Sequence, residues 1–215
     1  MKKVLLFDFD GTVMDGSGCI MSALEDTCNA LGYEMPPKER LKGFIGPPIV
    51  VSMQMAGFSD EDIPKVLDYY RMACRNSECM KKFKFFDGMK EMLAGLKAKG
   101  CKMAIVSMRT QGSLDDIAKV HGYSEYFDCI YGRQGDSDTN EKSELLERVF
   151  KILDAKKEEC IIIGDSVYDE QGANKTGIDF VAVTYGFGYE SEKDVGKAVK
   201  ICSSIPELTE YLMNL

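Results

Sequence analysis

The chain has 215 residues, of which 45% are hydrophobic and 29% charged, and its formal net charge is -8. This length can bury the core of one large domain, or of a domain with a small insert. The acidic balance argues against a nucleic-acid or anionic-membrane partner, because such surfaces repel a negatively charged protein. The first apolar run is short and no later stretch approaches the roughly 20 apolar residues of a membrane span, so we expect no signal peptide and a cytoplasmic protein.

The eight cysteines form no CxxC pair, and the chain has a single histidine. Zinc-binding spacing is therefore absent. Several of the cysteines lie inside apolar runs, so we expect buried, reduced thiols.

The first predicted strand is Val4–Phe7, a run of apolar residues that follows two lysines. Such a run is typical of a strand buried on both faces, inside a parallel sheet. Asp8 ends the run, Asp10 repeats the charge and Gly11 follows, so two carboxylates lie at the carboxyl end of this strand, where open parallel sheets bind ligands. Two such anions in a crevice need a cation or a proton nearby. The alternative is an Asp-rich turn that caps the next helix.

Between Asp15 and about Met80 the patterns indicate helices and no strand. The apolar spacing of the first helix places one face toward the core until a glycine ends it. The predicted segments are a helix ending at Gly32, one after Pro36-Pro37, one over 49–56, and one from an N-cap at Ser59 to Cys74. We therefore expect an all-helical insert after the first strand.

From Phe83 onward, predicted helices and strands alternate. The helices cover 89–96, 114–121, 141–153, a segment up to Gly177 and a last one from about Ser204, and the strands cover 102–107, 129–131, 160–163 and 180–183. A polar loop spans 133–140. Strands separated by single helices imply right-handed βαβ units, and these predict a doubly wound parallel sheet.

Polar residues follow several of these strands, and parallel strands bring their carboxyl ends to one edge of the sheet. The residues expected there are Asp8, Asp10, Ser107, Arg109, Asp165 and, slightly later, Asp169. Lys142 begins a helix near the same edge, where it opposes the helix dipole. A lysine in the first turn of a helix is electrostatically unfavourable, and an unfavourable residue at this edge of the sheet indicates a functional site.

This set contains carboxylates, one hydroxyl and one ammonium, and it contains neither histidine nor thiol. Oxygen ligands select a hard cation, and Mg²⁺ in octahedral geometry is the expected cofactor. A divalent ion between a protein carboxylate and a substrate phosphate also removes the repulsion between Asp8 and that phosphate.

Four segments resemble, in order and spacing, the four motifs of the haloacid dehalogenase superfamily: Asp8-Phe9-Asp10-Gly11-Thr12, Ser107, Lys142 and Gly164–Asp169. The resemblance covers nearly the whole chain. It is closest to the phosphoglycolate phosphatase-like, pyrophosphatase-like and 5'-nucleotidase-like members, to which the segments 44–48 and 183–188 are also similar.

The resemblance implies an α/β fold, with a Rossmann-like doubly wound parallel sheet as the core and an inserted all-helical cap domain. The core would comprise residues 1–14 and 82–215, and the cap residues 15–81.

It also implies roles for the site residues. Asp8 would be the nucleophile and Asp10 the general acid and base, while Ser107 and Lys142 would hold phosphoryl oxygens. Magnesium would be held by Asp8, the backbone carbonyl of Asp10, and Asp165. Asp169 would not bind the metal directly but would orient Lys142 or a metal-bound water. The residues implied to bind substrate are Gly11, Thr12, Met108 and Arg109.

The chain departs from the family pattern at three places. Gly16 stands where many members have serine and implies a more flexible hinge, Arg109 replaces a frequent lysine, and Ser143 follows Lys142 where a proline is frequent. Arg109 either contacts substrate or lies at a helix start.

Three of the site residues also have structural alternatives. Ser107 could merely end a strand, Lys142 could be a solvated helix residue, and Asp169 could cap the helix that follows it.

The predicted function is a magnesium-dependent phosphatase that hydrolyses small phosphate monoesters, or an anhydride, through an aspartyl-phosphate. Its partner would be a small phosphorylated metabolite. The alternatives are a sugar-phosphate mutase of the same superfamily and a catalytically silent phosphate-binding module. The sequence identifies neither the substrate nor the oligomeric state.

Overall fold

The computed structural model describes residues 4–135 and 137–215. Its main sheet has six parallel strands in the order β5-β4-β1-β6-β7-β8, so the first strand of the chain lies inside the sheet. The strands are β1 (Val4–Phe7), β4 (Lys102–Thr110), β5 (Cys129–Arg133), β6 (Cys160–Gly164), β7 (Asp179–Val183) and β8 (Lys200–Cys202). This arrangement confirms the predicted α/β class with a doubly wound parallel sheet.

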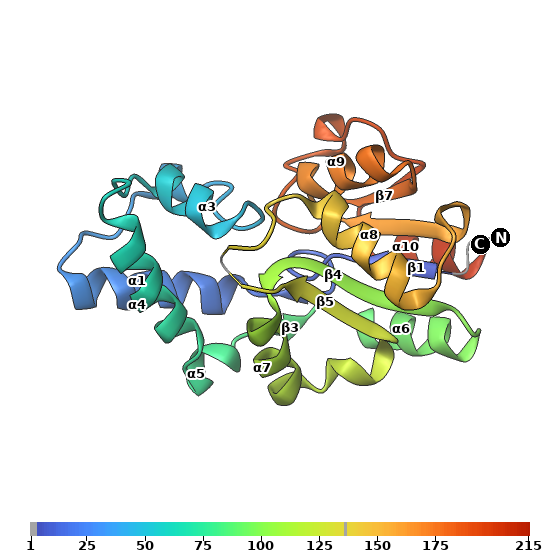
Figure 1. Cartoon of the computed structure of the whole chain (residues 1–215), viewed down its shortest axis with the longest axis horizontal. Coiled ribbons are helices and arrows are strands. Elements are labelled where there is room, and N and C mark those ends of the chain that lie inside the picture. The colour runs from blue at the N-terminus through green and yellow to red at the C-terminus, as the bar shows by residue number, and fades with distance from the viewer. Residues whose placement is uncertain (1–3, 136) are drawn as a thin grey trace.

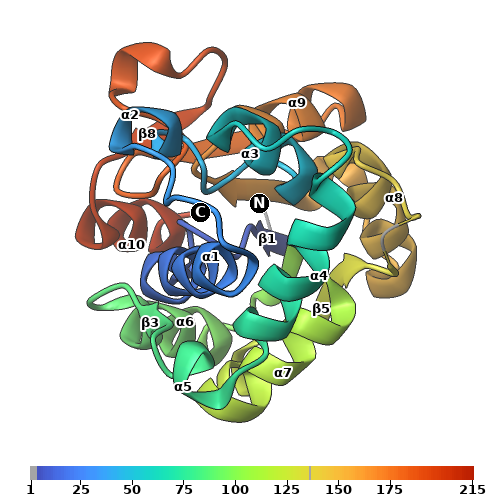
Figure 2. The ribbon, with the colours of Figure 1, turned by 90° about the vertical axis from the view of Figure 1, so that its left-hand side faces the viewer.

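Helices cover both faces of the sheet, which explains why β1 is apolar throughout. Leu5 and Phe7 face one cluster of core side chains, and Val4 and Leu6 face the other. The helices are α6 (Met89–Ala98), α7 (Gln111–His121) and α10 (Ile205–Met213) on the first face, and α8 (Lys142–Leu153) and α9 (Val167–Thr176) on the second (Figures 1 and 2). Because side chains alternate along a strand, each face of β1 meets a helical layer.

A helical segment stands at one end of the sheet, away from the two chain ends (Figure 1). Its helices are α1 (Ser17–Leu31), α2 (Lys38–Leu41), α3 (Ile49–Ala56), α4 (Ile63–Cys74) and α5 (Ser77–Met80). Two short strands, β2 (Met14–Asp15) and β3 (Lys84–Phe85), pair antiparallel at its base. The chain therefore enters and leaves this segment at one place. The division into a core and a cap at residues 15 and 81 stays a prediction.

The ends of several elements differ from the sequence prediction. β4 continues three residues beyond Ser107, because an irregularity between Val106 and Thr110 lets Thr110 pair with Arg133 of β5. Ser59 does not cap α4: its hydroxyl accepts a hydrogen bond from the Asp62 amide in a preceding turn, and Asp62 is the residue before the helix. The predicted polar loop includes residue 136, which lies outside the described residues.

Three short strands and one short α-helix were not predicted: β2, β3, β8 and α5. Each has two to four residues, too few for a periodic pattern to form. All eight cysteines are free, but the prediction that they are buried holds for five of them, since Cys74, Cys101 and Cys129 are half-buried. Within residues 4–135 and 137–215, none of the helices has the length and apolar composition that crossing a bilayer requires.

Candidate active site

A buried lysine joins two of the predicted carboxylates at the carboxyl edge of the sheet. The Lys142 ammonium Nζ lies 2.5 Å from Asp8 Oδ1 and 2.8 Å from Asp169 Oδ1. The Lys142 side chain is 3% exposed, so the alternative of a solvated helix residue is wrong. A buried ammonium is tolerated only where such partners compensate it. These contacts therefore tie the starts of α8 and α9 to the end of β1.

The charges of this group depend on one another. Burial alone would lower the pKa of Lys142, but Asp169 and Asp8 outweigh burial and hold that pKa above its ordinary value. Burial raises the pKa of Asp8, which Lys142 opposes and the Asp169 and Asp165 carboxylates reinforce. Lys142 thus stays charged, while the carboxylates around it are crowded.

Asp165 is held from the opposite side by backbone amides. Its Oδ2 accepts hydrogen bonds from the amides of Phe187 at 2.7 Å and Gly188 at 3.1 Å. Thr12 Oγ1 lies 3.4 Å from its Oδ1. Burial, with a contribution from the Asp169 charge, nevertheless raises the pKa of Asp165 to about 7. The backbone amides favour the ionised carboxylate, but burial and the Asp169 charge outweigh them.

Two glycines let the chain approach Asp165 closely. A Cβ at Gly11, whose φ is +81°, would lie 2.2 Å from Asp165 Oδ2. A Cβ at Gly186 would lie 2.3 Å from the Gly11 carbonyl oxygen and 2.4 Å from the same Oδ2. Side chains are therefore excluded at both positions, and the carboxylate lies against bare backbone.

Asp8, Asp165 and Asp169 each offer a carboxylate oxygen within 4.8 Å of the other two. Three buried carboxylates with a single ammonium leave an excess of negative charge that a divalent cation would neutralise. The oxygen donors suit a hard ion such as Mg²⁺. The side chain of Asp169 lies in this cluster and contacts Lys142, as predicted, and its role beside the metal ligands stays a prediction.

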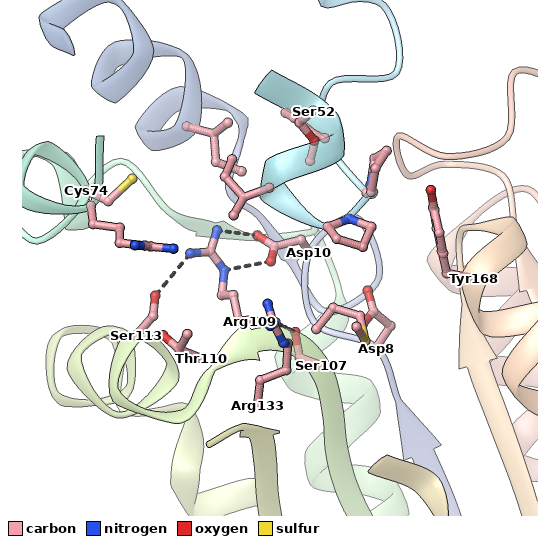
Figure 3. Close-up of a pocket in the computed structure, with 18 of the residues that line it drawn as sticks. Asp8, Asp10, Ser52, Cys74, Ser107, Arg109, Thr110, Ser113, Arg133 and Tyr168 are labelled. Carbon is pink, nitrogen blue, oxygen red and sulfur yellow. Dashed lines mark hydrogen bonds and ion pairs between the residues drawn. The ribbon is translucent and has the colours of Figure 1, made fainter. Parts of the chain in front are cut away.

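The Asp10 carboxylate is bound by Arg109 (Figure 3). Arg109 Nε donates to Asp10 Oδ2 at 2.7 Å and Nη2 donates to Oδ1 at 2.9 Å, while Nη1 donates to Ser113 Oγ at 3.1 Å. Neither alternative for Arg109, a substrate contact or a helix start, included this ion pair. It occupies both oxygens of the predicted acid and base, and it sets that carboxylate apart from the Asp8 cluster.

Gly16 is required for a packing reason that was not predicted, and its role as a flexible hinge stays a prediction. Its φ of -92° is one that other residues adopt readily. However, a Cβ there would lie 2.7 Å from Asp10 Oδ1 and 2.5 Å from the Phe83 ring. The glycine therefore makes room for the Asp10 carboxylate in its place beside Arg109.

Two further predicted residues combine structural and site contacts. Ser107 lies within β4, is 2% exposed, and accepts a hydrogen bond from the Arg109 amide at 3.2 Å. Asp169 caps α9 through its Oδ2, which accepts from the Ser166 hydroxyl at 2.7 Å, and pairs with Lys142 through Oδ1. The capping alternative for Asp169 is therefore correct, and so is its contact with Lys142.

A cavity of about 430 Å³ separates the sheet edge from the helical segment. Seven of the predicted residues line it: Asp8, Asp10, Ser107, Met108, Arg109, Lys142 and Asp169. Gly11, Thr12 and Asp165 are predicted site residues outside this lining, and Thr12 is fully buried against Asp165. The predicted substrate contact of Thr12 is therefore replaced by a contact with a proposed metal ligand.

The cavity also has lining residues that sequence reasoning missed, namely Arg71, Arg75, Arg133 and Tyr168. The spacing of four between Arg71, on a predicted helix, and Arg75, just after its predicted end at Cys74, was an available signal, because residues so spaced share one helix face. Which way that face points depends on tertiary packing.

A family model described as haloacid dehalogenase-like hydrolase matches residues 5–183. The chain belongs to this family. The predicted superfamily is thus confirmed, and the haloacid dehalogenase-like hydrolase motifs coincide with the residues gathered at the sheet edge.

Known proteins resemble this haloacid dehalogenase-like hydrolase along most of their length. It is 29% identical to a 5'-nucleotidase of Pseudomonas aeruginosa, over 97% of this chain and 94% of that protein. It is 27% identical to a phosphoglycolate phosphatase of Colwellia psychrerythraea, over 87% of each. The crystal structure of a predicted phosphatase from Clostridium acetobutylicum matches with a TM-score of 0.87 and 30% identity, over 100% of both chains. These names agree with the predicted enzyme class.

Proposed function

We propose that this haloacid dehalogenase-like hydrolase is a Mg²⁺-dependent phosphatase of small phosphate monoesters that acts through an aspartyl-phosphate on Asp8. The observation that carries the proposal is the contact of Asp8 with the buried Lys142 ammonium, within a cluster of three carboxylates. A carboxylate beside an ammonium and a metal ion can approach a phosphate dianion that it would otherwise repel. The names of the relatives support the same reaction.

In the first step, an Asp8 oxygen attacks phosphorus and the bond to the leaving oxygen breaks. Lys142 neutralises charge on the transferred group, and the Ser107 hydroxyl at the same edge donates to a phosphoryl oxygen. Each such donor contributes on the order of 10²-fold or more to the rate. Asp8 and Asp165, with the Asp10 carbonyl, would hold Mg²⁺, which supplies positive charge to the phosphoryl oxygens.

Asp10 handles the protons in both steps. It protonates the leaving oxygen, and it then takes a proton from the water that attacks the aspartyl-phosphate and releases Asp8. In the structure both Asp10 oxygens face Arg109. The proposal therefore requires that Asp10 leave this ion pair when substrate binds, and that residues 15–81 act as the cap that closes over the cavity.

The proposal is tested by phosphate release from a panel of phosphorylated metabolites: glycolate, nucleotide, sugar and pyrophosphate substrates. With Mg²⁺ we expect release from at least one, reversible loss on chelation, and a loss of about 10⁴-fold or more in Asp8→Asn. Circular dichroism should show that Asp8→Asn is folded. Release that survives either treatment would contradict the mechanism.

The same panel separates the alternatives. A mutase would convert sugar phosphates with little release of phosphate. A silent module would bind fluoroaluminate or phosphate but release nothing from any substrate.

A further inference from the structure

The cavity carries more positive than negative charge, although the whole chain is acidic. Its lining includes five cationic side chains, which are Arg71, Arg75, Arg109, Arg133 and Lys142, and three carboxylates, which are Asp8, Asp10 and Asp169. Counting Asp165 beneath the lining still leaves the cations in excess. In a protein of net charge -8, this local surplus indicates an anionic ligand.

Two of these cations already form ion pairs with carboxylates of the proposed phosphoryl-transfer site. Lys142 pairs with Asp8 and Asp169, and Arg109 pairs with Asp10. Arg133 is buried on β5 and donates from Nη2 to the Asp138 carbonyl at 3.2 Å. The excess positive charge of the cavity lining therefore includes that of Arg71 and Arg75, on the wall that α4 forms.

Arg71 and Arg75 lie in the last turn of α4 and just after it. Four positions apart, they share the helix face that lines the cavity. Arg71 is 3.9 Å from the exposed Asp68, and Arg75 is exposed and has no ion pair among the residues that the structure describes. Cations near the C-terminus of a helix interact favourably with the helix dipole. That interaction does not require both of them to face a cavity.

These arginines lie at the end of α4, which lines the cavity on the side of Arg109. Cys74, the neighbour of Arg75, lies on the Arg109 side, whereas Asp8 and Tyr168 lie toward the other side (Figure 3). The lining that α1, the segment before α3 and the first residue of α3 add is apolar, and it includes Ile20, Phe44 and Ile49. A phosphoryl group at Asp8 would thus place the carbon part of a substrate along apolar side chains, with its far end toward α4.

We propose that the leaving portion of the substrate carries a second anionic group, a carboxylate or phosphate, which binds Arg71 and Arg75. This inference rests on the proposed phosphatase function and narrows its substrate class. A charge-assisted contact to a guanidinium is among the stronger polar interactions that a protein makes. Short organic phosphates with a second charge are therefore favoured over monoesters whose leaving group is neutral.

Binding is tested with phenylphosphonate and 4-carboxyphenylphosphonate, whose carbon–phosphorus bond this reaction does not cleave. By calorimetry with Mg²⁺, we expect the carboxylated compound to bind the wild-type protein about tenfold more tightly. In the double variant Arg71→Gln/Arg75→Gln this ratio should fall to within about twofold of one. Lys65→Gln, which removes a charge from α4 outside the cavity lining, should keep the tenfold ratio.

Turnover is measured in parallel with phenyl phosphate and 4-carboxyphenyl phosphate. Equal affinities of the two phosphonates for the wild type, or a preference unchanged in the double variant, would overturn the second-anion site. A binding preference without release from either aryl phosphate or from any substrate of the metabolite panel would instead overturn the phosphatase function. If the double variant does not fold, Arg75→Gln alone changes an exposed side chain and tests the same ratio.

Discussion

The two sides of the cavity hold their charges in different ways. At the sheet edge, the side chains of Lys142, Asp8 and Asp169 are 3%, 13% and 1% exposed and contact one another. On the helical side, the Arg71 side chain is 32% exposed and Arg75 is exposed. Breaking a buried pair leaves an uncompensated charge, whereas changing a surface charge costs little. The edge is thus suited to a fixed reaction, and the helical side to a substrate preference that can change.

Replacement of Lys142 by methionine should have the largest effect on stability. The Asp8 and Asp169 carboxylates would lose their ammonium, so we expect the free energy of unfolding to fall by about 3–5 kcal/mol in the absence of metal. Urea denaturation measures this. The control is Lys175→Met, which removes an exposed partner of Glu141 and should cost no more than about 1 kcal/mol. Equal losses of stability in the two variants would mean that a buried ion pair contributes no more to stability than an exposed one.

The carboxylate cluster also predicts a pH dependence. Folding raises the pKa of Asp165 from 3.8 to about 7. Between these values the folded chain keeps a proton that the unfolded chain has released. The stability of the metal-free protein should therefore fall by up to a few kcal/mol as the pH rises from about 4 to 7.

Because Asp8 is shifted in the same direction, it adds to this fall. Mg²⁺ should replace the positive charge of the protons that these carboxyl groups release. It should therefore raise the melting temperature more at pH 8 than at pH 5. Thermal unfolding with and without Mg²⁺ measures both effects. An equal Mg²⁺ effect at the two pH values would be inconsistent with a cluster that titrates in this window.

Arg109 lies between the two sides, and its substitution should have an intermediate effect. Arg109→Ala leaves Asp10 without its partner, so we expect a loss of about 1.5–3 kcal/mol in the free energy of unfolding. Arg109→Lys should lose less, about 1 kcal/mol, because an ammonium keeps the charge but cannot bind both carboxylate oxygens in the same fork. Guanidinium chloride denaturation compares the two. A lysine variant as unstable as the alanine variant would show that the ion pair depends wholly on that geometry.

The elements that the sequence predicted well carry their own local signals. β1 is uniformly apolar, and α1 ends at Gly32 with the left-handed backbone that favours glycine. The edge residues were predictable as well, because parallel strands end at one edge whatever the details of packing. Asp8, Lys142 and Asp169 could therefore be brought together before any coordinates were known.

Contacts between distant segments carry no such signal. The pairing of Asp10 with Arg109 joins residues 99 positions apart and depends on the irregularity in β4 that continues the strand past Ser107. The orientation of Arg71 and Arg75 toward the cavity depends on how α4 packs on α1. Neither follows from apolar periodicity, which describes one element at a time.

The donors that hold Asp165 come from nearly the far end of the chain. Its Oδ2 receives the amides of Phe187 and Gly188, and Gly186 packs against it and against Gly11. A nascent polypeptide that has emerged from the ribosome only as far as β7 lacks these donors, although the carboxylates of Asp8 and Asp165 are already present. During translation the Asp165 site therefore stays incomplete until the segment that follows β7 has emerged.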